Sequence, residues 1–99
     1  MLQAGADDIL KGKPMSRQDR IIALLDEQFS PNHLDVRDVS AQHHGHAGWR
    51  EGGETHFEVS IRAAGLSALS RIEAHRAVND ALAGELEAGL HALQIQILR

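Results

Sequence analysis

The sequence predicts an α+β domain in which helices pack on one face of a three-stranded mixed sheet. Two segments carry apolar residues at helical spacing, one near the N-terminus and a longer one in the C-terminal half. Three other segments favour strands, because apolar and polar residues alternate in them. The order is helix, strand, strand, one or two helices, strand. Because a strand–helix–strand connection returns parallel and right-handed, the last strand should pair in parallel with the second.

The composition is that of one small globular domain. The chain has 99 residues, of which 42% are apolar and 3% aromatic, so the core must be aliphatic. The absence of cysteine excludes disulfides, thiolate-only metal sites and a cysteine nucleophile. The formal charge of −4 argues mildly against a nucleic-acid binder, since such proteins gain most of their affinity by neutralising phosphates.

Residues 1–14 are weakly patterned, and we expect them to form a flexible extension to a domain that spans 15–99. They contain no apolar signal core. No apolar run in the chain approaches the roughly 18 residues of a membrane span. We therefore expect a cytoplasmic protein that does not bind membranes and is a monomer when alone.

The first helix should cover residues 17–29. Ser16 is a good N-cap residue and Asp19 falls in the first turn. An apolar stripe follows, and the helix should end at Ser30, because Pro31 and its predecessor disfavour helix.

Two strands should follow, joined by a long loop into an antiparallel hairpin. The first covers residues 34–40, where Val39 falls out of phase and suggests a bulge or an edge position. Residues 42–54 form the loop, which is rich in glycine and histidine. The second strand, 55–62, alternates clearly between apolar and polar residues.

The C-terminal half contains the segment around which the chain is organised. After a turn at 63–68, where a short helical turn is plausible, a long amphipathic helix should end before Gly89, a residue suited to a left-handed C-cap. Its apolar face should consist of Leu69, Ile72, Val78, Leu82 and Leu86. The last strand then alternates from Leu93 to Ile97. His91 therefore lies at a junction between two packed elements, which suits a ligand or a binding side chain.

Several stretches of this chain resemble the BolA family. They are Thr-His-Phe at 55–57, Ala-His-Arg-Ala-Val-Asn at 74–79, Leu-Ala-Gly-Glu-Leu at 82–86 and His-Ala-Leu at 91–93. The loop at 43–48 is similar to the histidine-bearing loop of many bacterial members. The resemblance covers residues 15–97. It implies a fold like the type II KH domain, in agreement with the predicted topology.

The resemblance implies a partner and a cofactor. The family partners monothiol glutaredoxins in iron–sulfur cluster trafficking or iron regulation. The ligands that it implies are His91 and a loop histidine that corresponds best to His46, with His43 or His44 as alternates. No nucleophile–base pair, phosphate-binding loop or paired carboxylates stand out in the sequence, so we expect no enzymatic activity.

The chemistry of the residues is compatible with a shared cluster. Imidazole binds iron and zinc, and a [2Fe–2S] cluster can take two histidines beside thiolates. A chain without cysteine cannot hold such a cluster alone in the usual way, so a glutaredoxin cysteine and glutathione would supply the sulfur in a heterodimer, and the isolated chain would carry no cofactor. A zinc site in the loop is the alternative. Without the resemblance, a histidine at the start of a strand, such as His91, is more often a hydrogen-bonded structural residue than a metal ligand. For His56 we expect a surface position or a role in supporting a ligand.

Four further residues are candidates for partner binding: Trp49 in the loop, and Arg71, His75 and Arg76 in the long helix. The arginines could equally form a solvated helix face. They also motivate an alternative function, a DNA-binding transcriptional regulator that uses the KH-like helix surface.

The sequence departs from the family pattern at positions that bear on this alternative. Ala74 replaces a common arginine, and Leu66 and Ala68 replace an aromatic residue and a glycine. The segment between the second strand and the long helix also lacks the Gly-x-x-Gly loop with which KH domains bind nucleic acid. The DNA-binding reading is therefore weaker than the cluster reading.

Overall fold

The computed structural model describes residues 15–43 and 53–99. The elements follow in the order α2 (Arg17–Phe29), β1 (His33–Asp38), a short 3₁₀ helix η1 (Ser40–His43), β2 (His56–Arg62), α3 (Ala64–Ser67), α4 (Arg71–Ala81), α5 (Ala83–Glu87) and β3 (Ala92–Ile97). Of Gln42 and His43, only the backbone is described. No helix in these two ranges is long and apolar enough to cross a bilayer.

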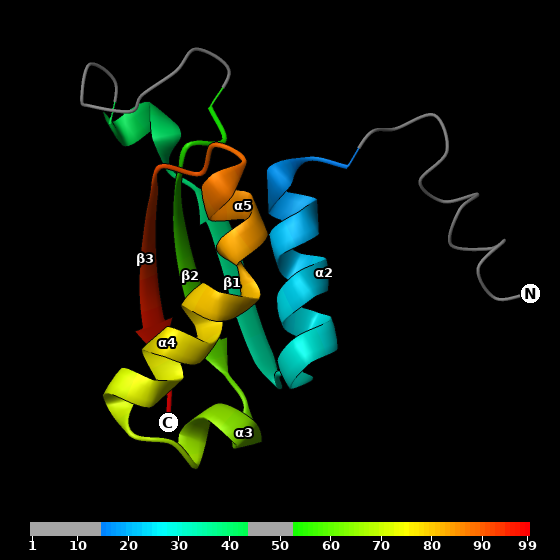
Figure 1. Ribbon diagram of the computed structural model, residues 1–99, viewed down its shortest axis with the longest axis vertical. Coiled ribbons are helices and arrows are strands. Elements are labelled where there is room, and N and C mark those ends of the chain that lie inside the picture. Colours follow the sequence, from blue (N-terminus) through cyan, green and yellow to red (C-terminus); the bar gives the residue numbers. More distant parts are fainter. Residues whose placement is uncertain (1–14, 44–52) are drawn as a thin grey trace, which may run out of the picture.

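The sheet has the predicted topology. Its strand order is β1-β2-β3, with β1 antiparallel and β3 parallel to β2. The helices α2, α4 and α5 cover one face of the sheet, and the other face carries no helix among the described residues (Figure 1). The α+β class and the three-stranded mixed sheet are thus confirmed.

The core lies between the helices and the covered face of the sheet. The buried positions of β2 alternate as expected, with Phe57, Val59 and Ile61 each at most 2% exposed. Ile21 and Leu25, one helical turn apart in α2, pack against the same cluster. The helices are positioned by capping boxes at Ser16 and Ser70, each of which satisfies two otherwise unpaired backbone donors.

The long C-terminal helix differs from the expectation in two ways. It is divided at Leu82 into α4 and α5. Ile72, assigned to its apolar face, is 63% exposed. The reason is the helical phase: Ala74 and Val78 are fully buried, and Ile72 precedes Ala74 by two residues, or about 200° around the axis. Because Ala74 is small, the spacing of the large apolar residues did not show that this position faces the core.

The first strand also differs from its prediction. It runs from His33 to Asp38, and its register against β2 is continuous, so there is no bulge within it. Val39 follows the strand, is buried, and donates its backbone N–H to the His56 carbonyl at 2.8 Å. The change of phase therefore marks the end of the strand.

Gly89 has the predicted positive φ, 127°, in the turn between α5 and β3. A side chain is strongly disfavoured in this conformation, whereas glycine adopts it readily. This turn determines how the chain reaches His91 and β3.

Candidate ligand site at the starts of strands β2 and β3

His91 lies immediately before β3 and its side chain is exposed. Its backbone N–H donates to the Thr55 carbonyl at 2.8 Å, and the N–H of Ala92 donates to the same oxygen at 3.0 Å. The preceding residue, Leu90, is 3% exposed and packs into the core. The backbone of His91 is thus fixed on both sides, while its imidazole remains accessible.

His56, at the start of β2, lies beside His91. The two ring centroids are 5.3 Å apart and the ring planes are tilted by 52°. His56 is 4% exposed, so the prediction that it lies on the surface is wrong. The other prediction for His56, that it supports a ligand, stays a prediction. Its Nδ1 lies 2.8 Å from the Thr55 hydroxyl, a hydrogen bond that fixes the orientation of the ring.

Ser40 and Asp38 hold the start of β2 in place. The Ser40 hydroxyl accepts hydrogen bonds from the backbone N–H groups of Thr55, at 2.9 Å, and His56, at 3.1 Å. The Asp38 carboxylate accepts from the N–H groups of Ser40, at 2.9 Å, and Glu54, at 3.0 Å. Burial raises the pKa of Asp38, but the hydrogen bonds from Ser40 and Glu54 and the nearby His56 outweigh it, so the pKa lies below its ordinary value.

Arg17 joins the two segments that lead to these histidines. Its guanidinium donates to the carbonyl of Glu54, two residues before His56, and to the carbonyl of Ala88, three residues before His91, the latter at 3.1 Å. Its Nε lies 2.9 Å from Glu85 Oε1, and both side chains are buried.

Glu85 is the acidic centre of this network. Arg20 also binds it, with Nε 2.7 Å from Oε2. The hydrogen bond from Arg20, followed by that from Arg17, lowers the pKa of Glu85 below its ordinary value, against an opposing effect of burial. The sequence pattern did not indicate that Arg17, Glu54 and Glu85 support the site. One signal in the sequence could have indicated the network. Glu85 follows Leu82 by three residues and therefore places a carboxylate on the apolar face of the predicted helix.

Of the remaining predicted site residues, the structure fully describes Arg71, His75 and Arg76. His44, His46 and Trp49 lie outside the described residues, and the side chain of His43 is not described. Arg71 and His75 line a groove beside Ile97 at the opposite end of β3 from His91. Arg76 is exposed and lies outside that groove. The structure therefore separates His91 from Arg71 and His75 by about the length of β3, roughly 20 Å for six residues.

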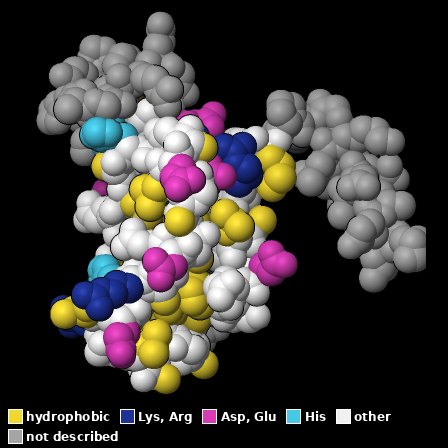
Figure 2. Space-filling model, viewed as in Figure 1, with side chains coloured by type: hydrophobic (Ala, Val, Ile, Leu, Met, Phe, Trp, Pro, Cys, Tyr) yellow, Lys and Arg dark blue, Asp and Glu magenta, His cyan; other side chains and the backbone are white. Residues whose placement is uncertain are grey.

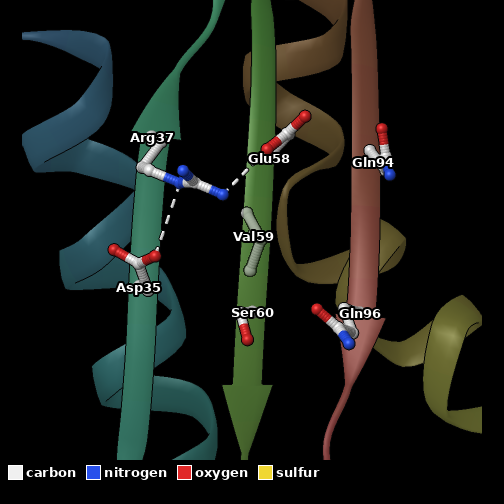
Figure 3. A pocket seen from close by; sticks show the side chains of 7 residues that line it. All are labelled: Asp35, Arg37, Glu58, Val59, Ser60, Gln94 and Gln96. Carbon is white, nitrogen blue, oxygen red and sulfur yellow. Dashed lines mark hydrogen bonds and ion pairs between the residues drawn. The ribbon is translucent and has the colours of Figure 1, made fainter.

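The uncovered face of the sheet is polar (Figure 3). A shallow pocket there is lined by Asp35, Arg37, Glu58, Val59, Ser60, Gln94 and Gln96. Arg37 binds Glu58 at 3.0 Å and Asp35 at 3.5 Å. Its side chain is 65% exposed, so these pairs are solvated cross-strand contacts that contribute little to stability.

The potential metal ligands in the described part of the chain are few. Among residues 15–43 and 53–99, no group of three or more His, Asp or Glu side chains is arranged to hold a metal ion. His91 and His56 are adjacent but supply only imidazole nitrogen.

Comparison with known proteins identifies the family. The family model described as BolA-like protein matches residues 25–98. An uncharacterized protein in the cobS 5′ region of Sinorhizobium sp is 43% identical over 83 residues, which cover 83% of this chain and 89% of the relative. The chloroplastic protein BOLA1 of Arabidopsis thaliana is 42% identical over 82 residues, or 81% of this chain and 51% of that protein. This chain therefore spans only about half of the plant relative.

Solved structures indicate the same family. The BolA domain of SufE1 from Arabidopsis thaliana has a TM-score of 0.74 and 40% identity, and the match covers 84% of this chain and 91% of that domain. Sequence and three-dimensional structure thus lead to the same assignment, over the region that contains β2, α4 and His91. The chain belongs to the BolA family.

Proposed function

We propose that this protein is a non-enzymatic adaptor that binds a monothiol glutaredoxin and shares a [2Fe–2S] cluster with it, in iron–sulfur cluster trafficking or iron regulation. One observation carries the proposal: a chain of the BolA family, with no cysteine, presents the exposed imidazole of His91 on a rigid backbone. A rigid backbone with an accessible side chain is what a ligand shared between two proteins requires.

The residues present fit one half of such a coordination sphere. His91 would be one ligand, and His46 the second, with His43 and His44 as alternates. A partner cysteine and glutathione would provide the thiolates that this chain lacks. Bound in this way, the cluster would supply one-electron redox chemistry, and its potential would be raised by histidine ligation.

His56 supports His91 in this proposal. Because its ring is buried, held by Thr55 and 5.3 Å from the His91 ring, it restricts the positions that the exposed imidazole can adopt. Restricted motion lowers the entropic cost of coordination. His56 is thus a positioning residue, whereas His91 would bind iron.

The decisive experiment is a titration of a cluster-loaded glutaredoxin homodimer with this protein, followed by absorbance and circular dichroism. We expect a new spectrum that saturates at one-to-one and is lost in His91→Ala. His33→Ala is a matched control, because His33 is an exposed histidine at the start of β1, the strand at the other edge of the sheet. An unchanged spectrum on titration, or a new one that persists in His91→Ala and His46→Ala, would contradict the proposal.

The alternatives predict other outcomes. Zinc bound tightly by the chain without a partner would favour a zinc site in the loop. The DNA-binding alternative is the weaker one, because its exposed arginines, Arg71 and Arg76, belong to a chain with a formal charge of −4. The cytoplasmic location stays a prediction, and one relative is named as chloroplastic.

A further inference from the structure

Strand β3 forms an open edge of the sheet. In the order β1-β2-β3, it has a neighbour on one side only within the described part of the chain. The backbone N–H groups of Ala92 and Leu98 donate toward β2, at 3.0 Å to Thr55 and 2.8 Å to Ile61. Because backbone direction alternates along a strand, the intervening odd-numbered residues turn their N–H and C=O groups outward. These residues are Leu93, Ile95 and Ile97.

This edge lacks the features that usually prevent strand addition. Exposed edges commonly carry charged side chains or proline. β3 has the sequence ALQIQI, with neither. The opposite edge differs: β1 carries Asp35 and Arg37, and its Val36 carbonyl accepts a hydrogen bond of 2.7 Å from the side chain of Gln18. Of the two edges, β3 is therefore the one suited to receive another strand.

A basic groove runs beside this edge. It is lined by Arg71 and His75 from α4, by Arg99, and by Ile95, Gln96 and Ile97 from β3. Figure 2 shows arginine side chains in dark blue next to a histidine in cyan, over the start of α4 and the end of β3. Arg99 Nη1 donates to the carbonyls of Ser67, at 2.9 Å, and Leu69, at 3.0 Å, which fixes the guanidinium at the groove.

The charge of this groove is not neutralised by neighbouring acids. The ion pairs formed between described residues involve Arg17, Arg20 and Arg37, and include neither Arg71 nor Arg99. Two guanidinium groups thus face solvent beside outward-facing backbone groups and apolar side chains. This combination recognises an extended chain that offers backbone hydrogen bonds and carboxylates together.

We propose that the β3 edge binds an extended acidic segment of a partner protein, which adds a strand to the sheet and places carboxylates against Arg71 and Arg99. A second copy of this chain fits less well, because its β3 has no acidic residue to set against the arginines. Nucleic acid could contact the arginines but could not pair with the outward backbone. The groove lies at the far end of β3 from His91, and the proposed binding does not depend on the cluster.

The test uses synthetic peptides and the whole protein. The probe is a fluorescein-labelled peptide of alternating glutamate and valine, compared with the same peptide carrying lysine in place of glutamate. We expect the acidic peptide to bind saturably at low salt and the basic one to bind at least about tenfold more weakly, because only the acidic one complements the groove. Amide shifts in NMR spectra should be largest at residues 93, 95 and 97.

Two matched controls separate charge from strand pairing. Arg71→Glu should weaken acidic-peptide binding about tenfold, whereas Arg76→Glu, on the same helix but outside the groove, should change it less than about twofold. Two peptides, one N-methylated at every valine and the other at every glutamate, keep their charges but each lose one set of alternate backbone donors. One of the two lacks the donors that face β3, and it should lose binding without any change to the protein.

The proposal is overturned by equal binding of the acidic and basic peptides, by undiminished binding of both N-methylated peptides, or by equal effects of Arg71→Glu and Arg76→Glu. It is likewise overturned if sedimentation shows that the protein is a dimer and amide shifts on dilution place residues 93, 95 and 97 in the dimer interface. None of these outcomes bears on the cluster titration, because no glutaredoxin is present.

Discussion

Arg17 and Glu85 form a buried ion pair, with Nε and Oε1 2.9 Å apart, that joins the start of α2 to α5. The same guanidinium bonds to the backbone carbonyls that precede the two neighbouring histidines. The pair thus links the helical layer to the turns that lead into His56 and His91.

Removal of Arg17 should therefore destabilise the fold. Arg17→Ala leaves Glu85 with Arg20 as its partner and leaves the carbonyls of Glu54 and Ala88 without their donor. We expect a loss of about 3 kcal/mol in the free energy of unfolding, at the low end for a broken buried pair because Arg20 remains. Urea denaturation measures it. Arg37→Ala is the control: its pairs are exposed, and it should cost less than about 1 kcal/mol. Equal costs would show that the Arg17 network is not structural.

Stability should fall in acid through Asp38 and Glu85. The pKa of each carboxyl is lowered in the folded protein, so the unfolded chain binds more protons at acidic pH. The stabilisation is present above the unfolded values, about 4, and is lost as the pH falls through the lower folded values. Urea midpoints at pH 3 and pH 7 test this. Asp38→Asn should reduce the difference between them, whereas Asp26→Asn, at an exposed aspartate of α2, should not.

Two glycines should respond in opposite directions to alanine. Gly89 has a φ of 127°, so Gly89→Ala should cost about 1–3 kcal/mol through backbone strain. Gly84 lies within α5 and has open space where a Cβ would be, so Gly84→Ala should stabilise the protein by roughly 0.5–1 kcal/mol. Thermal unfolding of both variants decides this. A stabilised Gly89→Ala would contradict the assigned turn geometry.

The phase of α4 predicts a contrast between two large apolar residues. Leu82→Ala should cost about 2–5 kcal/mol, because Leu82 is fully buried and its loss leaves a cavity. Ile72→Ala should change the free energy of unfolding by less than about 0.5 kcal/mol, because the side chain is 63% exposed. A large loss of stability in Ile72→Ala would contradict this phase and support the apolar face that the sequence pattern predicted.

Much of the fold could be read from the sequence because local signals agree with the tertiary structure. The capping residue Ser16 and the break at Ser30 predicted α2 with its observed bounds. Alternation in β2 and β3 predicted their pairing once the parallel crossover was assumed. The apolar face of the long helix was mispredicted because small or polar residues, Ala74 and Glu85, occupy buried positions in it. The spacing of large apolar residues does not reveal such positions.

The candidate site was less predictable. His91 was identified from its junction and from the family resemblance, and its exposure and fixed backbone agree with a ligand role that remains to be tested. The burial of His56 was missed, because alternation assigned it to the polar face, although it is 4% exposed there. The Arg17 contacts join residues far apart in the sequence, and one sequence taken by itself carries little signal for such pairs.

The double hydrogen bond at the Thr55 carbonyl makes His91 dependent on the completed topology. The acceptor, Thr55, immediately precedes β2, and the donors, His91 and Ala92, lie where β3 begins, with the whole helical crossover between them. Such non-local pairings form late, because the intervening loop must close first. We therefore expect an incompletely folded chain to have the helix of α2 but no fixed imidazole, so that metal coordination through His91 would distinguish mature molecules from folding intermediates.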